Sequence, residues 1–190
     1  HTGETDLGTI PSSEYAFGGY AIGPGIAIGS RGPVRSVNLY QKRPLAEVRR
    51  VALDTSSRTS VALLKVLLRE RLGRDPEYVE MAPDVPHMLE RCDAALVIGD
   101  AALDYQGDVE RLDLGRMWHT LTGLPFVWAF WAGRSDALGP ADVARLQRAL
   151  REGLAAVQAI ARDWANGDPA RAALNESYLR HNIAYALGEP

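Results

Sequence analysis

Cysteine is almost absent from this chain: Cys92 is the only one among 190 residues, so no disulfide can form within the chain. We interpret Cys92, which is closely followed by Ala94 and Ala95, as a small, partly buried residue and not as a nucleophile. A chain without disulfides is typical of the cytoplasm, and that is where we expect the protein to act.

Long apolar runs and an excess of one charge are also missing. No stretch of about 18 apolar residues occurs, so the sequence predicts no membrane insertion. With 21 Lys and Arg against 24 Asp and Glu, the net charge is −3, which does not favour binding to nucleic acid. A local basic pocket for a small acid is still compatible with this balance. The apolar fraction of 46% is sufficient for a packed core.

The familiar catalytic and cofactor motifs are absent as well. The sequence contains no GxGxxG, GxxxxGK[ST], CxxC or HExxH, no paired-carboxylate motif and no Ser-His-Asp order. We therefore expect neither a metal nor a cofactor, and we identify no general acid or base. His119 has a titratable ring, but a packed histidine with one hydrogen bond is the favoured interpretation. Trp118, Trp128 and Trp131 are expected in the core or at an interface between lobes.

What the chain does contain is short apolar runs that alternate with helical patterns, which indicates α/β layering. Between Val51 and Asp100 the predicted order is strand, helix, strand, helix, strand, and this order favours a parallel sheet with right-handed crossovers. The clearest helix lies within residues 55–73, where Thr59 or a neighbouring serine can cap the start and Gly73 ends it. The predicted strands are Gly25–Ser30, Ser36–Lys42, Val51–Asp54, Tyr78–Ala82 and Ala94–Asp100, and a short helix covers Val85–Arg91.

The C-terminal third is predicted to be mostly helical. The run FVWAFW indicates a buried strand by its length and aromatic content. From Pro140 we expect one long helix, with an apolar face that continues to Ile160 and a solvated face of mixed charge. A final helix follows over residues 170–187.

The segment Thr55–Ser60, with the sequence TSSRTS, is the first candidate binding site. It follows a strand and opens a helix, and backbone amides at the start of a helix attract anions with the help of the helix dipole. Arg58 could add a charge-assisted hydrogen bond. Thr59 and Ser60 are the hydroxyl-bearing residues that we assign to an anionic group. The alternative is a hydroxyl-rich helix cap without a ligand.

The turn with the sequence GSRGPVRS, residues 29–36, is the second candidate. It offers Ser30 and Arg31 as donors at a place where a crossover between lobes would run. A surface turn joining two strands explains the same residues. Ser12 and Ser13 are the third candidate, at the start of a short helix, where a purely structural role is again the alternative.

The fourth candidate is the end of an apolar strand at Gly99 and Asp100. Residues beyond the carboxyl ends of parallel strands line ligand crevices, and glycine permits a close approach of the backbone. A cap of the next helical turn by Asp100 is the alternative to a direct role.

Several motifs, taken in order, resemble one known family. DLGTIPSSEYA and GIAIGSRGPVRSVNLYQKRPLAEV are followed by VALDTSSRTSVALLKVLL, AALVIGDAAL, DLGRMWHTLTGLPFVWAFWAGR and ESYLRHNIAYALG. They cover nearly the whole chain and resemble the menaquinone-biosynthesis proteins of the futalosine route. Within that family, GSRGPVRSV, TSVALL and WHTLTGLPFVWAFW are more similar to the members that dehydrate chorismate than to those that form dihydroxynaphthoate.

The resemblance implies an α/β fold of the type-II periplasmic-binding-protein kind, with two lobes and a ligand cleft. We place the first lobe in residues 1–35 and 125–190 and the second lobe in residues 36–124. Family members usually begin with a further strand and a helix–strand unit, so we expect the first lobe to be N-terminally incomplete in this sequence. No oligomeric state is predicted.

The resemblance also implies an activity, which is the elimination of water from chorismate to give 3-[(1-carboxyvinyl)oxy]benzoate without a cofactor. In the absence of a general base, the side-chain carboxylate of this small dicarboxylate substrate could take that role. The alternatives are a non-catalytic solute-binding protein for a small carboxylate and the sister enzyme, 1,4-dihydroxy-6-naphthoate synthase. The expected substrate-binding residues are Ser12, Ser13, Ser30, Arg31, Thr59, Ser60, Gly99 and Asp100.

Overall fold

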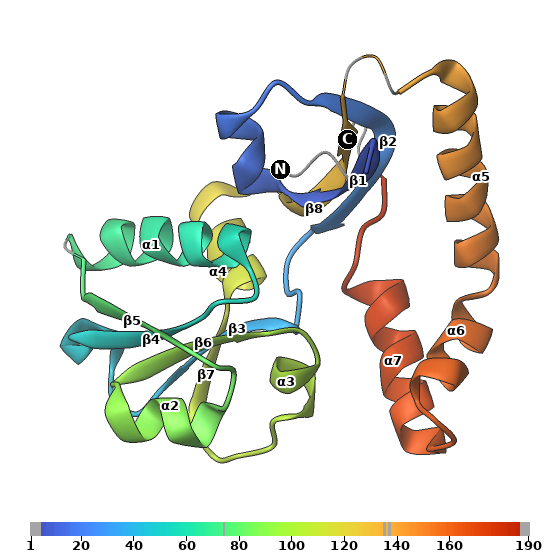
Figure 1. Ribbon diagram of the computed structural model, residues 1–190. Helices are drawn as coiled ribbons and strands as arrows, with labels where there is room; N and C mark the ends of the chain where they lie inside the picture. Colours follow the sequence, from blue (N-terminus) through green and yellow to red (C-terminus); the bar gives the residue numbers. More distant parts are fainter. Residues whose placement is uncertain (1–4, 74, 135, 137, 187–190) are drawn as a thin grey trace. The chain divides into compact units, whose positions relative to one another are not determined.

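The computed structural model describes residues 5–73, 75–134, 136 and 138–186. The chain divides into two compact units (Figure 1). One unit comprises His1–Arg31 and Val127–Pro190, and the other comprises Gly32–Phe126. Each unit is described by itself.

The unit of residues 32–126 is built on a five-stranded sheet in the order β5-β4-β6-β3-β7. β4 pairs in parallel with β5 and β6, as the sequence predicted, whereas β3 pairs antiparallel with β6 and with β7. In the register, Leu53 faces Leu96 across the parallel pair, and Leu39 faces Leu96 and Leu112. The strands are β3 (Val37–Gln41), β4 (Arg50–Asp54), β5 (Glu77–Met81), β6 (Ala94–Ile98) and β7 (Glu110–Asp113).

Helices cover both faces of this sheet, with α1 and α4 on one side and α2 and α3 on the other (Figure 1). Because the central strands are covered on both faces, every residue of β3 is buried, and β6 has the continuous apolar sequence AALVI. Tyr40, Ala95 and Val97 pack with Met88 and Leu89 of α2 in one core cluster. The helices are α1 (Arg58–Leu72), α2 (Val85–Arg91), α3 (Gly99–Asp104) and α4 (Leu114–Thr122), with a single 3-10 turn, η2 (Leu45–Glu47).

The helix ends follow ordinary capping chemistry. Ser57 accepts a hydrogen bond from the backbone amide of Ser60, so Ser57, and not Thr59, caps α1. Asp84 caps α2 by accepting from the amide of His87 at 3.0 Å. Gly73 ends α1 at φ 64°, the left-handed conformation that the sequence predicted for it.

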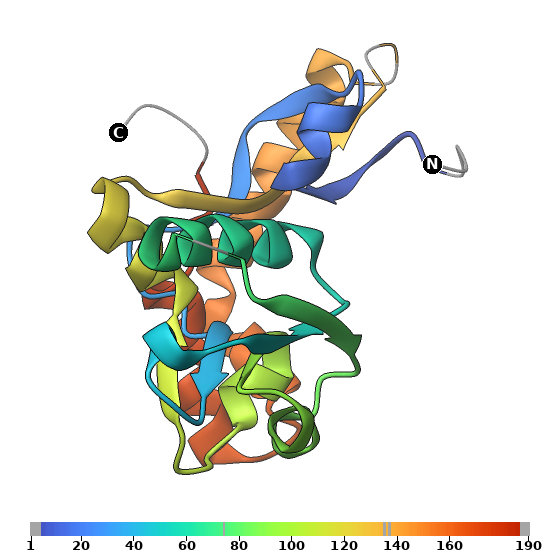
Figure 2. The same ribbon diagram turned by 90° about the vertical axis from the view of Figure 1, so that its left-hand side faces the viewer.

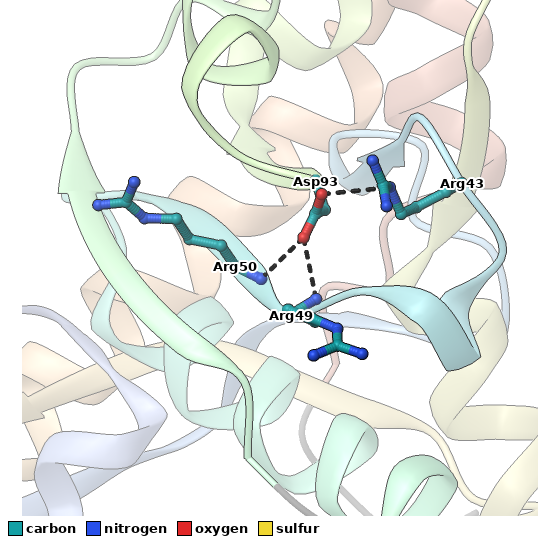
Figure 3. A network of polar contacts seen from close by, with 4 residues as sticks. All are labelled: Arg43, Arg49, Arg50 and Asp93. Atoms are coloured by element: carbon teal, nitrogen blue, oxygen red, sulfur yellow. Dashed lines mark hydrogen bonds and ion pairs between the residues drawn. The ribbon is translucent and has the colours of Figure 1, made fainter.

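Asp93 directly precedes β6 and closes the amino edge of the sheet, where the parallel strands β4 and β6 begin (Figure 3). Its carboxylate accepts hydrogen bonds from the backbone amides of Arg49 at 3.0 Å and Arg50 at 3.1 Å, and it lies 3.2 Å from the Nε of Arg43. Partial burial favours the protonated form, but the two amides and the charge of Arg43 outweigh it and lower the pKa of Asp93. Asp93 therefore fixes the start of β4 to the start of β6.

The other unit contains a three-stranded sheet in the order β1-β8-β2. β1 pairs antiparallel with β8, and Ile10, Ala27, Phe130 and Ala132 form its core cluster. The chain after α7 returns to β2, where Gly29 forms an antiparallel bridge with Ala184. The elements are β1 (Leu7–Pro11), the 3-10 helix η1 (Ser12–Phe17), β2 (Ala21–Ser30), β8 (Phe126–Gly133), α5 (Pro140–Ala155), α6 (Val157–Trp164) and α7 (Pro169–His181).

Three sequence predictions of element boundaries are wrong. The long helix from Pro140 to Ile160 is two helices, because the chain breaks at Ala156 (φ −98°, ψ 8°). The final helix ends at His181 and not at residue 187. The strand predicted to reach Asp100 ends at Ile98, and Gly99 already begins α3.

Figure 2 shows the long α1 lying across the strands of its sheet, with α2 and α3 beyond them.

Candidate functional site

Asp54, the last residue of β4, organises the carboxyl edge of the five-stranded sheet. Its side chain is buried, with 1% of the residue exposed. The carboxylate accepts hydrogen bonds from the backbone amide of Ser56 at 2.9 Å, from the Ser56 hydroxyl at 2.5 Å and from the backbone amide of Ile98 at 3.1 Å. Because Ile98 ends the neighbouring strand β6, one carboxylate ties together the chain segments that leave two adjacent parallel strands.

The predicted anion loop follows directly. The Ser57 hydroxyl donates to the Ser60 hydroxyl at 2.9 Å and accepts from the Ser60 amide at 3.2 Å. Thr59 and Ser60 are 3% and 2% exposed, so both pack beneath the loop, whereas Ser56 and Arg58 are exposed. An anion at the start of α1 would therefore contact the exposed residues Ser56 and Arg58. The dipole of the long helix behind them would add to the attraction.

Gly99 supports the same edge from the next strand. It adopts φ +65°, which favours glycine, and its amide donates to the carbonyl of Ser36 at 2.8 Å. Asp100 lies in the first turn of α3 and is exposed, but its side chain does not cap this helix. The capping alternative for Asp100 is therefore wrong, since the N-cap position belongs to Ile98.

A second carboxylate, Asp113, fixes the turn that includes residues 32–36. It accepts hydrogen bonds from the backbone amides of Val34 at 3.1 Å and Arg35 at 2.6 Å, and it caps α4 through the amide of Arg116 at 2.9 Å. Arg35 is held at φ 64°, a conformation that a non-glycine residue seldom adopts. The predicted surface turn is thus anchored to β7.

The predicted binding residues of the other unit take part in its own packing. The Ser12 hydroxyl donates to the carbonyl of Val127 at 2.7 Å, and Ser13 follows it in η1. Ser30 is 1% exposed and accepts a hydrogen bond from the Trp128 indole at 3.1 Å. The site set thus falls into two groups: Thr59, Ser60, Gly99 and Asp100 lie in the unit of residues 32–126, and Ser12, Ser13, Ser30 and Arg31 lie in the other unit.

The remaining sequence candidates have structural explanations. Cys92 is buried, and this burial raises the pKa of its thiol, which agrees with an inert residue. Trp128 is buried as predicted. His119 is exposed, so its prediction as a packed residue is wrong, because it lies on the outer side of α4. Its Nδ1 lies 3.4 Å from the carbonyl of Leu124, which is the one hydrogen bond expected for it.

Sequence analysis missed Asp54 and Asp113, which hold the two loops in place. Asp113 carried a local signal, because it directly precedes the helical run LGRMWHTLT and is therefore a natural N-cap. Asp54 carried a weaker one, as the last residue of a buried strand before a row of hydroxyls. Its bond to the amide of Ile98 joins residues 44 positions apart and has no counterpart in the local sequence.

The fold and these strand-end loops define an α/β protein of the periplasmic-binding-protein type. It has a TM-score of 0.59 and 24% identity to a crystal structure of an Archaeoglobus fulgidus protein, with 93% of this chain and 64% of that chain covered. It has a TM-score of 0.57 and 16% identity to an ABC transporter protein from Parabacteroides distasonis, with 96% and 68% covered. At these identities the two likenesses show the fold. The chain thus spans less than two thirds of the Archaeoglobus protein.

Similarity in sequence identifies the family within this structural class. A family model described as menaquinone biosynthesis matches residues 1–190. The chain is also 36% identical to the chorismate dehydratase of Thermus thermophilus, over all of this chain and 76% of that protein. The chain therefore belongs to this menaquinone-biosynthesis family, as its motifs predicted. None of the helices in the described part of the chain is long and apolar enough to cross a membrane.

Proposed function

We propose that this protein is a chorismate dehydratase that works in the cytoplasm, in the biosynthesis of menaquinone. The observation that carries this proposal is the 36% identity to a chorismate dehydratase over the full chain. The geometry of the carboxyl edge supports it, because a hydroxyl-rich helix start stands beside a buried carboxylate that holds the loop in shape. A preorganised set of donors suits a substrate with two carboxylates.

The proposed reaction removes the ring hydroxyl of chorismate together with one ring proton, and the ring becomes aromatic. The products are water and 3-[(1-carboxyvinyl)oxy]benzoate. The task of the protein is to hold the carboxylates, orient the ring and help the hydroxyl group to leave. We assign the proton to the substrate's own side-chain carboxylate, which is consistent with the lack of a recognisable general base in the sequence.

Within the unit of residues 32–126, we assign one substrate carboxylate to the start of α1. Arg58 is exposed there and carries the charge, while Thr59 and Ser60 shape the loop from below. Gly99 has no side chain, so a ligand can come close to the backbone of the neighbouring segment. Asp100 is exposed beside it. Ser12, Ser13, Ser30 and Arg31 belong to the other unit and stay predictions from the family resemblance.

One assay separates this function from its alternatives. The protein is incubated with chorismate and, separately, with cyclic dehypoxanthine futalosine, and the products are followed by mass spectrometry. A chorismate dehydratase lowers the mass of chorismate by one water, and the sister enzyme converts only the futalosine derivative. A solute-binding protein returns either ligand unchanged, and that result would remove the proposal.

The anion loop is tested by the double variant Thr59→Ala/Ser60→Ala. We expect the KM for chorismate to rise about tenfold or more, because the Ser60 hydroxyl bonds to Ser57 and the loop loses its preorganised shape without it. The matched control is Asp84→Ala, which removes the cap of α2 and costs about 1 kcal/mol of stability without touching the loop. Unchanged kinetics in the folded double variant would contradict the assignment.

A further inference from the structure

A cavity of about 460 Å³ lies along β7 and α4 in the unit of residues 32–126. It is lined by four arginines from four different segments: Arg35 from the turn before β3, Arg71 from the end of α1, Arg111 from β7 and Arg116 from α4. It shares no lining residue with the Thr55–Ser60 loop or with Gly99 and Asp100. This basic cavity is therefore separate from the binding residues assigned above.

The positive charge of the basic cavity is balanced only in part by the residues that line it. Among the described residues that line it, Asp113 is the only acidic one, and its carboxylate already accepts three backbone amide hydrogen bonds. Within the described part of the chain, none of the four arginines forms an ion pair with a carboxylate. Four guanidinium groups facing one carboxylate leave an excess of positive charge, and an anion bound between the arginines would reduce their mutual repulsion.

Asn38 gives a second, independent indication of a ligand. It lines the basic cavity and is 0% exposed. Its Nδ2 donates to the carbonyl of Arg35 at 2.7 Å, but no described residue donates to its Oδ1. A buried acceptor without a partner is unfavourable, and a hydroxyl or protonated amine of a bound molecule would satisfy it.

The wall around these groups is preorganised. Arg35 is held at φ 64° by the bond of its amide to Asp113 at 2.6 Å, and its carbonyl orients the amide group of Asn38. Asp113 and Arg116 are also linked through the cap of α4. The positions of three cavity residues are therefore set by backbone contacts before any ligand arrives.

We propose that the basic cavity binds a small polyanion with two or more carboxylate or phosphate groups and a neighbouring hydroxyl or amine donor. The arginines hold the anionic groups through their planar donor forks, and Asn38 Oδ1 accepts from the donor of the ligand. This is a second binding site, in addition to the dehydratase activity proposed for the strand-end loops.

The test is isothermal titration calorimetry of the protein with citrate, with inorganic pyrophosphate and with tricarballylate, which is citrate without its hydroxyl. We expect saturable binding of citrate or pyrophosphate that weakens as salt is added, and the stronger of the two identifies the anionic group. If citrate binds, tricarballylate should bind about tenfold more weakly, since it leaves Asn38 Oδ1 without a donor. Equal binding of citrate and tricarballylate would overturn the role of Asn38.

The variant Arg111→Gln/Arg116→Gln should weaken binding about a hundredfold, while Arg145→Gln/Arg148→Gln on α5 should leave it unchanged. Circular dichroism shows whether each variant is folded, and chorismate turnover is measured separately. An absence of saturable binding, or an equal loss in both variants, would overturn the proposal. Loss of turnover in the folded Arg111/Arg116 variant would assign the cavity to the substrate site and overturn its separate role.

Discussion

At each end of the five-stranded sheet an aspartate joins β4 to β6, but the two aspartates bind different kinds of donor. At the carboxyl edge Asp54 joins β4 to β6, and at the amino edge Asp93 joins the same two strands. Asp54 is buried and uses only neutral donors, whereas Asp93 is partly exposed and is paired with Arg43. The amino edge is thus held by an ion pair as well as by hydrogen bonds, whereas Asp54 holds the carboxyl edge by hydrogen bonds from neutral donors.

The largest difference is expected between Asp54→Ala and Asp93→Ala. Asp54→Ala removes the acceptor of three partly buried hydrogen bonds and should cost about 3 kcal/mol, with a loss of chorismate turnover of tenfold or more. Asp93→Ala should cost about 1–2 kcal/mol and leave kcat unchanged below its melting temperature. Chemical denaturation and steady-state kinetics measure both effects. If Asp93→Ala lowers kcat as much as Asp54→Ala, the two edges are not functionally different.

A smaller and more closely matched difference is expected between two glycines. Gly99 at the carboxyl edge has φ +65° and Gly73 at the other end of the unit has φ +64°, and an added Cβ meets no atom within 4 Å at either position. Alanine at each should therefore cost about 1–2 kcal/mol through backbone strain alone. Only Gly99→Ala should also raise the KM for chorismate. Equal kinetics in two variants of equal stability would remove Gly99 from the candidate site.

The smallest effect concerns pH and the amino edge. The pKa of Asp93 is lowered in the folded state, so its stabilising contribution is complete above the unfolded pKa of about 3.9 and is lost as the pH falls through the lower folded value. Asp93→Asn should therefore be less stable than the unmodified protein at pH 6, by up to about 1 kcal/mol, and this difference should be smaller at pH 3. Thermal unfolding at the two pH values measures this. A constant difference would show that the charge of Asp93 contributes little.

Much of the unit of residues 32–126 could be predicted because its elements carry local signals. The apolar runs of β4 and β6, the helical periodicity before Gly73 and the cap at Asp84 all lie within short windows of sequence. β7 could not be predicted in this way. Its sequence ERLD is short and charged because it pairs on one side only, at the edge of the sheet.

The candidate site was predicted as a set of loops, but not through the carboxylates that hold the loops in place. Hydroxyls after a strand and glycine at a strand end are visible in a single window, which is why the sequence suggested Thr59, Ser60 and Gly99 as candidates. The bond from Asp54 to the Ile98 amide depends on two strands lying side by side, and that is a property of the assembled sheet. The break at Ala156 was missed for a related reason, because the apolar pattern continues through it.

The reversed strand β3 has a consequence for the order in which the unit assembles. The crossovers from β4 through β5 to β6 join segments that are near in sequence, whereas β3 pairs with β6 and β7 far along the chain. Contacts between distant segments carry a larger entropic cost and tend to form late. β7 belongs to the sheet only through β3, so insertion of this one strand should complete the sheet and recruit β7 and α4 in a single cooperative step.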